Sequence, residues 1–488
     1  MSLKFDNSYL RELEGMYAIC SAEQVAAPRW LKFNRALAEE LGFEADAFDT
    51  AEAAEYFAGN KMLLGAAQIA QAYAGHQFGN FVPQLGDGRA LLLGEVIDRN
   101  GLRRDIQLKG SGRTPFSRSG DGKAAIGPML REYLMGEAMH HLGIPTTRAL
   151  AVVTTGEFVH REILLPGAVL TRVAASHIRI GTFEFFAARN DVANLRRLAD
   201  YTIRRHYSEL IGQPYDEFLK AVIARQAQLV AGWMGVGFIH GVMNTDNMAL
   251  SGETIDYGPC AFMEHYDPAT VFSSIDRHGR YAFGNQPAIA QWNLARFAEA
   301  LLHLLDDDPD RAIRVATEAV GTFKERYAEA QLALIRRKLG LVNTEADDAV
   351  LVQEFLDAML AGRADYVLAW RNLSYAVEST PEKLRSVFVG GAEKLDAWLP
   401  RWQARLAREE RNLVEVVADM RRVNPCLIPR NHQVEYALEA ASSHDDFTPF
   451  ERLLEALQDP YSESAATSPY AIPASPEQTA AYRTFCGT

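Results

Sequence analysis

The stretch Phe238–Gly258 reads FIHGVMNTDNMALSGETIDYG, and it decides the fold class of this chain. Asn247 lies seven positions after His240, and Asp256-Tyr257-Gly258 follows on the next turn of the chain. Amide and carboxylate oxygens are hard donors of the type that holds Mg²⁺ against nucleotide phosphates. The spacing therefore indicates a metal and nucleotide site in which Asn247 and Asp256 are the ligands.

This spacing resembles the catalytic and metal loops of a protein kinase, where His-x-Asp, four residues and Asn precede a separate Asp-x-Gly. One position departs from that pattern, because Val242 stands where the catalytic aspartate belongs. Asp246, immediately before Asn247, could replace that base by receiving a proton from a hydroxyl group. A loop-capping aspartate is the alternative reading. The site therefore does no chemistry, or chemistry that differs from that of a conventional kinase.

The bulk composition narrows the class of protein. A length of 488 residues predicts one large two-lobed body or two to three domains. The net charge of −13 argues against broad nucleic-acid binding, which needs a basic surface. The chain shows no signal-peptide layout, and its longest apolar run, Leu229–Ile239, is too short to span a membrane. Its cysteines are scattered without a CxxC pair, so we expect a soluble, cytoplasmic protein.

Hydrophobic patterning predicts an α+β, protein-kinase-like two-lobed fold with three parts. Residues 1–75 are expected to form a mostly helical extension. Residues 76–178 form a β-rich N-lobe with one key helix, at 126–142, and strands at 81–82, 90–97, 105–109, 149–154 and 168–173. Residues 179–488 form a large helical C-lobe that carries the loops at 240–258. Its helices are expected at 190–210, 215–234, 289–305, 311–339 and 348–360. A helical extension follows after 300, and a tail from 461 should be weakly ordered by itself.

The N-lobe carries two phosphate-binding candidates. Gly86, Gly88 and Arg89 lie between the first two strands, where glycines let backbone N–H groups approach phosphate oxygens, although such a sequence is also a common hairpin turn. Lys109 ends an apolar strand, the place of a phosphate-pairing lysine. A carboxylate on the following helix should orient it. Glu132 and Glu137 both qualify, and spacing alone cannot separate them.

Two further groups of cations are candidates for phosphate contacts. The insertion at 110–123 combines four glycines with Arg113, Arg118 and Lys123, and could wrap a polyphosphate or be a flexible basic surface loop. Arg172 and Arg179 lie between the β-rich and helical parts, where a cleft would form. Either could instead form a structural salt bridge.

Taken together, these residues resemble the selenoprotein O family. The matching strings are FxNSY at 5–9, AGHQFG at 74–79, LGDGR at 85–89, QLKGSG at 107–112, HGVMNTDNM at 240–248, DYGP at 256–259 and IPRNH at 428–432. Several of them are long and unlike the strings of ordinary kinases. The match runs through most of the chain.

The resemblance implies a kinase-fold protein adenylyltransferase. ATP would bind in a flipped orientation, AMP would pass to Ser, Thr or Tyr hydroxyls of proteins, and pyrophosphate would leave. UMP transfer from UTP with Mn²⁺ is a further possibility. Asp246 would be the general base, Asn247 with Asp256 would bind Mg²⁺ or Mn²⁺, and Glu132 would be the partner of Lys109. The implied nucleotide contacts are Gly86, Gly88, Arg89, Lys109, Asp121, Gly122, Arg172, Arg179 and Asp256.

Family members also carry a cysteine or selenocysteine near the C-terminus, the place of Cys486. In some relatives it bridges to a cysteine beyond the Asp-x-Gly motif. The comparable stretch here, 268–273, has no cysteine, and Cys260 is displaced from it. A plain exposed thiol at Cys486 is therefore about as well supported as a redox clip.

Two other functions compete with nucleotidyl transfer. A small-molecule phosphotransferase related to aminoglycoside kinases would need the aspartate that Val242 replaces, so this residue counts against it. A non-catalytic nucleotide-binding scaffold would keep metal-dependent ATP binding and form no product.

Overall fold

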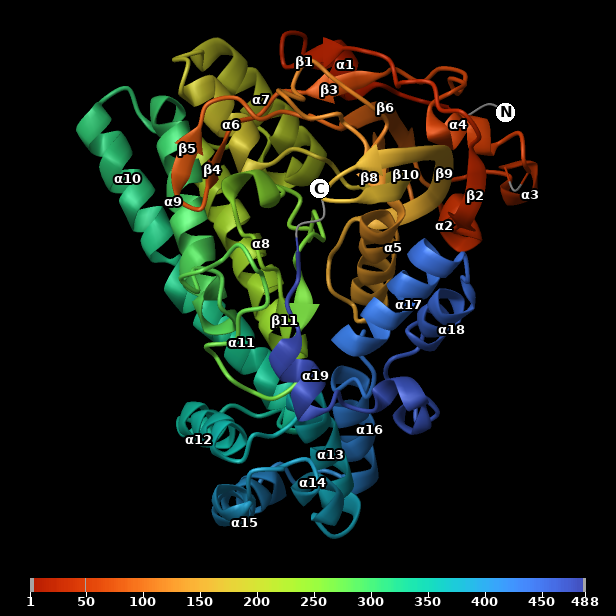
Figure 1. Cartoon of the computed structure of the whole chain (residues 1–488). Helices are drawn as coiled ribbons and strands as arrows, with labels where there is room; N and C mark the ends of the chain where they lie inside the picture. The colour runs from red at the N-terminus through yellow and green to blue at the C-terminus, as the bar shows by residue number, and fades with distance from the viewer. Residues whose placement is uncertain (1–3, 49, 486–488) are drawn as a thin grey trace.

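The computed structural model describes residues 4–48 and 50–485. It is a mixed α/β protein in which a large antiparallel sheet with one covering helix lies beside a larger helical part (Figure 1). None of the helices in the described ranges is long and apolar enough to cross a membrane. The expected combination of a β-rich part and a large helical part is confirmed.

The central sheet runs in the order β1-β3-β6-β7-β10-β9-β2, with β8 paired to β10. Its strands are β1 Tyr17–Ile19, β2 Arg29–Phe33, β3 Ile69–Gln71, β6 Ala90–Ile97, β7 Arg103–Lys109, β8 Ala124–Ala125, β9 Arg148–His160 and β10 Leu164–Ala174. In the pairing of β7 with β10, Arg172 lies opposite Gln107 and Leu170 opposite Lys109. Side chains two residues apart on a strand share a face. The register therefore puts Lys109 and Arg172 on the same face.

The N-terminal segment differs from the expected helical extension. It holds four short helices, α1 Ser8–Glu12, α2 Arg35–Glu40, α3 Ala45–Phe48 and α4 Ala54–Ala58, but it also supplies β1, β2 and β3 to the sheet. These short strands carry little periodic signal. β3 pairs with β6, and β2 pairs with β9. Without these partners, β6 and β9 would be sheet edges with unpaired backbone groups.

The first strand expected in the N-lobe lies outside the main sheet. β5 Asn80–Val82 pairs with β4 Gly75–Gln77 in a separate two-stranded hairpin. A tight turn at Phe78 and Gly79, both with positive φ, joins the two strands. β4 and β5, each of three residues, satisfy each other's backbone hydrogen bonds within this hairpin. β5 is therefore not a strand of the main sheet.

One helix covers the sheet. α5 Ile126–His141 matches the expected helix, and Gly143, with a φ of 73°, turns the chain after it. Its buried side chains, among them Met129, Leu130 and Leu134, belong to a core that continues into the helical part. α5 touches β9 and β10. Its Glu132 therefore lies within hydrogen-bond distance of Lys109 on β7 and Arg172 on β10.

The helical part begins after β10 and contains most of the remaining chain. Its helices are α6 Ile180–Ala187, α7 Val192–His206, α8 Tyr215–Val236, α9 Gln286–Leu305, α10 Pro309–Gly321, α11 Phe323–Lys338, α12 Asp348–Ala361, α13 Tyr366–Glu378, α14 Glu382–Arg385, α15 Glu393–Ala407, α16 Leu413–Val423, α17 Asn431–His444, α18 Thr448–Ala456 and α19 Pro476–Ala481. The single helix expected at 311–339 is two helices divided at Thr322. Gly321 precedes this break, and glycine is a weak helix former.

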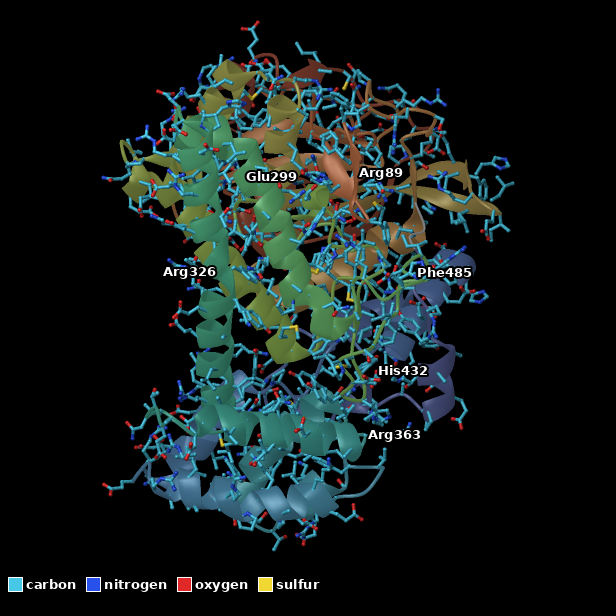
Figure 2. The ribbon with its side chains drawn as sticks, turned by 90° about the vertical axis from the view of Figure 1, so that its left-hand side faces the viewer. Arg89, Glu299, Arg326, Arg363, His432 and Phe485 are labelled. Carbon is cyan, nitrogen blue, oxygen red and sulfur yellow. The ribbon has the colours of Figure 1, made fainter. Side chains whose placement is uncertain are left out.

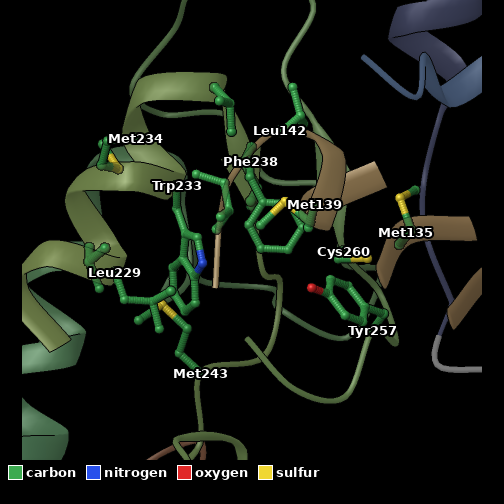
Figure 3. Packing of buried hydrophobic residues seen from close by; sticks show 14 of the residues in the cluster. Met135, Met139, Leu142, Leu229, Trp233, Met234, Phe238, Met243, Tyr257 and Cys260 are labelled. Atoms are coloured by element: carbon green, nitrogen blue, oxygen red, sulfur yellow. The ribbon is translucent and has the colours of Figure 1, made fainter. Parts of the chain in front are cut away.

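The loops at 240–258 are packed into the hydrophobic core between α8 and α5. Figure 3 shows Trp233 of α8 and Met139 of α5 close to Phe238 and Tyr257, at the two ends of the loop region. The indole nitrogen of Trp233 donates to Thr254 Oγ1 at 2.8 Å. This packing fixes the position of the segment just before Asp256.

The C-terminal segments return to the sheet-bearing part. α17 lies against α5, and Arg131 of α5 binds Glu435 of α17 at 2.8 Å (Figure 1). The tail from 461, for which the sequence predicts weak order by itself, is held by other segments. Arg131 also donates to Tyr482 at 2.8 Å, and Thr484 forms a β-bridge with Ser273.

A buried ion-pair cluster joins three distant segments of the helical part. Arg430, which is fully buried, donates to Asp365 at 2.6 Å and to Glu264. Asp365 also caps α13 by accepting from Leu368 N at 2.8 Å. Removing one partner of a buried pair leaves uncompensated charge and costs more than the pair contributes.

We therefore predict that Arg430→Met lowers the free energy of unfolding by about 3–5 kcal/mol. Thermal and urea denaturation followed by circular dichroism measures this change. The control is Arg422→Met, whose side chain is 75% exposed beside Asp419 and should change stability by less than about 1 kcal/mol. Equal stability of the two variants would contradict the structural role of Arg430.

Candidate functional site

A cleft of about 770 Å³ lies between the sheet, α5 and the loops at 240–258. Its walls include the LGDGR segment, the insertion at 110–123, both metal-ligand candidates and the last described residues of the chain. Arg89 and Phe485, both labelled in Figure 2, are far apart in the sequence but line the same cleft. Every nucleotide-contact residue that the resemblance implies lines it as well.

Asp256 is the point at which three cations meet. Its Oδ1 accepts from Lys109 Nζ at 2.8 Å and from Arg172 Nη1 at 2.6 Å, and its Oδ2 accepts from Arg179 Nη1 at 3.3 Å. Lys109 and Arg172 come from adjacent strands, and Arg179 precedes α6. The sequence-predicted cations therefore do converge on the Asp-x-Gly aspartate.

The partner of Lys109 is Glu132. Glu132 Oε2 accepts from Lys109 Nζ at 2.6 Å, and its Oε1 accepts from Arg172 at 3.1 Å. Glu137 faces Arg148 instead, with two contacts of 2.6 Å. This geometry decides the alternative that chain spacing leaves open.

The charge of Asp256 is held by its surroundings. Burial alone raises the pKa of this carboxyl, but the charges of Lys109, Arg172 and Arg179 outweigh it and bring the pKa well below its usual range. The residue also has a φ of 63°, which is uncommon for a side chain other than glycine. Such backbone strain is concentrated at functional sites.

Asp246 has the opposite environment. It is 8% exposed, and its Oδ1 has no hydrogen-bond partner in the described part of the chain. Burial raises the pKa of Asp246 to about 6, although the charge of Arg179 opposes this shift. A carboxyl with a pKa near the working pH suits a general base.

Gly75 makes room for this carboxyl, and Gly181 makes room for the backbone just before Gly75. A Cβ atom on Gly75 would lie 2.5 Å from Asp246 Oδ1, and one on Gly181 would lie 2.0 Å from Ala74 O. Arg179 Nη1 donates to the backbone oxygen of Asp246 at 2.9 Å. The AGHQFG segment at 74–79 therefore packs directly on the loop that carries Asp246.

Asn247 and Asp256 fit a divalent cation that is shared with phosphates. Asn247 Nδ2 donates to Val242 O at 3.0 Å, so the side-chain Oδ1 of Asn247 is the atom that could bind a metal. The ionised Asp256 supplies a hard carboxylate. The described ranges contain no group of three or more His, Cys, Asp or Glu side chains that could hold a metal by themselves. Mg²⁺ commonly takes one or two protein ligands and completes its shell with phosphate and water oxygens.

The insertion at 110–123 folds over the LGDGR segment. Thr114 Oγ1 donates to Asp87 O at 2.7 Å, and Ser117 Oγ donates to Gly88 O. A Cβ atom on Gly86 would lie 2.3 Å from the Phe116 ring, so only glycine fits there. The insertion is thus held by specific contacts on the cleft.

Asp121 and Gly122 close the base of this insertion. Asp121 forms two contacts with Arg161, the shorter at 2.8 Å. Burial raises the pKa of Asp121, but Arg161 and the Lys123 backbone N–H together bring it below its usual value. Gly122 has a φ of 68°, and a Cβ atom there would lie 2.0 Å from Gly112 O.

Several cleft residues were not predicted from the sequence. Asp87 is buried, and burial raises its pKa to about 6. Tyr73 lies under the Arg179 guanidinium at 4.4 Å, and Arg161 reaches the cleft from the turn between β9 and β10. The residues that these side chains contact are distant in the chain, so no local sequence pattern predicts that they line the cleft. For Asp87 alone, its position inside the GDG segment indicates a place at the cleft.

Cys486 lies outside the described residues. Cys260 is buried, and burial raises the pKa of its thiol to about 12. A thiol with so high a pKa is a poor nucleophile. Cys260 therefore acts as a small core residue beside α5 (Figure 3).

Comparisons with known proteins define the class of this chain. The family model described as "Protein adenylyltransferase SelO" matches residues 1–458. A protein of Cereibacter sphaeroides named "Protein nucleotidyltransferase YdiU" is 60% identical over 491 residues, which cover 100% of both chains. Proteins of the same name from Rhodopseudomonas palustris and Bradyrhizobium sp. are each 57% identical over 99% of both chains. Taken with the site, these matches identify a nucleotidyltransferase enzyme.

The chain belongs to the protein adenylyltransferase SelO family. The family expected from the sequence motifs is confirmed.

The environment of Asp246 predicts a pH-dependent stability change. Below about pH 3 the carboxyl is protonated in the folded and unfolded states and contributes nothing. Above about pH 7 it is ionised in both, and burial of the ionised form costs about 3 kcal/mol. We expect Asp246→Asn to raise the melting temperature at about pH 8 and to leave it unchanged at about pH 3. A variant that is less stable than the parent at pH 8 would contradict this environment.

Proposed function

We propose that this protein transfers AMP from ATP to Ser, Thr or Tyr hydroxyls of other proteins and releases pyrophosphate. ATP lies in the cleft in a flipped orientation, with its α-phosphate toward Asp246 and its β- and γ-phosphates toward the insertion at 110–123. The observation that carries the proposal is the displaced carboxylate: Val242 holds the kinase base position, while the buried Asp246 has a pKa of about 6.

The charge of the cleft supports phosphate binding. Lys109, Arg172 and Arg179 meet at Asp256, and Arg89, Arg118 and Arg161 line the same cleft. Ammonium and guanidinium groups are the side chains that bind phosphate oxygens. The triphosphate would bind among these cations.

The insertion suits the departing end of the nucleotide. Arg89, Arg118 and Lys123 line the cleft together with the insertion. Pyrophosphate is more highly charged than the single phosphoryl group that a kinase transfers. Cations in a folded but surface-facing loop stabilise this leaving group and still allow it to dissociate.

Asn247 and Asp256 would hold the Mg²⁺ or Mn²⁺ ion that accompanies the triphosphate. The ion supplies charge neutralisation at the phosphates. Gly86, Gly88 and Gly122 let the backbone approach the nucleotide, and Asp121 keeps Arg161 in position beside it. Glu132 orients Lys109 for the same purpose.

The chemical step uses Asp246 as the general base. Its carboxylate accepts the proton of the acceptor hydroxyl, and the hydroxyl oxygen forms a bond to the α-phosphorus. The bond between the α-phosphorus and the bridging oxygen to the β-phosphate breaks, and its electron pair leaves with pyrophosphate. Lys109, Arg172 and Arg179 stabilise the negative charge that develops on the phosphate oxygens.

Two labelled substrates test the reaction. The protein is incubated with acceptor proteins and ATP labelled at the α-phosphate, and separately with ATP labelled at the γ-phosphate. We predict transfer of the α label only, with pyrophosphate as the second product. Transfer of the γ label alone would show a conventional kinase, and nucleotide binding without transfer of either label would show a scaffold.

Two single substitutions separate the proposed roles. Asp256→Ala should abolish metal-dependent ATP binding in isothermal titration calorimetry, because it removes a proposed metal ligand and the carboxylate that positions the three cations. Asp246→Ala should keep ATP binding within a few fold and lower kcat by about 10²–10⁴-fold. Asp310→Ala, at an exposed position on α10, is the control. Unchanged kcat in the Asp246 variant would exclude it as the base.

A further inference from the structure

A second cavity, of about 1060 Å³, lies away from the nucleotide cleft. Its walls come from the turn after α5, the second half of α8, the end of α11 and the end of α16. These elements are adjacent in the lower part of the helical region (Figure 1). Among the described residues, the two cavities share no lining residue.

The lining of this cavity is cationic in a chain of net charge −13. Five cations line it: Arg225, Arg336, Arg337, Lys338 and Arg422. No aspartate or glutamate of the described ranges is part of the lining. On the surface of an acidic protein, a concave region with cations alone is unusual and attracts anions.

Two of the five cations are neutralised from outside the cavity. Arg336 Nε binds Asp348 at 2.7 Å, and Arg422 Nη1 binds Asp419 at 2.7 Å. The other three have no carboxylate partner among residues 4–48 and 50–485, so their charge is available to a ligand.

The three remaining cations are held in different ways. Arg225 donates to His206 O at 2.9 Å and stacks on the Tyr207 ring at 4.0 Å. Lys338 is buried, and its Nζ donates to Gly235 O at 2.8 Å. Arg337 is exposed, and its guanidinium forms no hydrogen bond or ion pair with the described part of the chain. Carbonyls and a ring thus orient two cations, and Arg337 is the one most able to reach a ligand.

The ammonium of Lys338 is held among apolar groups and beside another cation. Burial, together with the charge of Arg337, lowers the pKa of this ammonium to about 7. No neighbouring carboxylate raises it. A bound anion would favour the charged form of Lys338.

The rest of the lining is apolar. Ile144, Leu229, Leu334, Leu341 and Val342 contribute aliphatic surface beside the cations. Val342 is 65% exposed, which is high for a residue of this type. A ligand that satisfies both parts of the cavity has an acidic head and an aliphatic body.

We propose that this cavity is a binding site for a small amphipathic anion, with a carboxylate or phosphate head and an aliphatic body. The head contacts Arg337 and lies within the field of Arg225 and Lys338. The aliphatic body covers Leu334, Val342 and neighbouring side chains.

Binding of decyl compounds tests the site. Isothermal titration calorimetry of the full chain uses decanoate and decyl phosphate, with decanol as the neutral control. Saturating ATP and Mg²⁺ are present, so that the nucleotide cleft is filled. We expect saturable binding of at least one of the two anions and no detectable binding of decanol. The anion that binds more tightly identifies the preferred head group.

Charge reversal on α11 provides a matched pair of variants. Arg337→Glu should weaken binding of the preferred anion by about tenfold or more, the usual effect of losing a charge-assisted contact. Arg326→Glu makes the same charge reversal on the same helix, at an exposed position outside the cavity (Figure 2). It should leave the affinity for the anion unchanged.

Filling the cavity provides a second pair that keeps the charge. Ala333→Trp puts a large side chain at an exposed lining position and should abolish binding. Ala328→Trp, at an exposed position of α11 outside the lining, should have no effect. The proposal is overturned if neither anion binds, if decanol binds equally well, or if both members of each pair behave alike.

Discussion

The structure depends on the sharing of one carboxylate, Asp256, among three cations from different elements. Lys109 and Arg172 reach it from neighbouring strands, and Arg179 reaches it from the start of α6. Glu132 is a second carboxylate of the cluster, and the charges of Asp87 and Asp246 also act on Arg179. The buried cations and carboxylates compensate one another, so removing either kind leaves uncompensated charge.

The rest of the fold keeps this cluster in place. The pairing of β7 with β10 puts Lys109 and Arg172 on one face, and α5 holds Glu132 behind them. On the other side, Trp233 anchors the chain before Asp256, while His240 Nε2 contacts Ile255 O at 2.9 Å. The same packing buries the base candidate beside the cluster, so two carboxylates ten residues apart have opposite pKa shifts. That contrast suits the two proposed roles, metal binding for Asp256 and proton transfer for Asp246.

Local patterns predicted the parts of the site that lie within one segment. The spacing from His240 to Asp256 is read along the chain, and the strand of Lys109 and the helix of Glu132 follow ordinary periodicity. The choice between Glu132 and Glu137 needed the packing of α5 on the sheet. The strands β1–β3 and the contact of Arg161 with the insertion depend on partners far away in the chain, so no local pattern contains them. The cationic cavity joins four separate elements and is likewise invisible to a linear reading.

The proposed AMP transfer requires the reversed placement of the triphosphate in the cleft. A crystal structure of the complex with Mg²⁺ and a non-hydrolysable ATP analogue tests it most directly. We predict an α-phosphate facing Asp246 and a terminal phosphate beside the insertion at 110–123. A terminal phosphate facing Asp246, with the adenine base deep in the cleft as in conventional kinases, would contradict it.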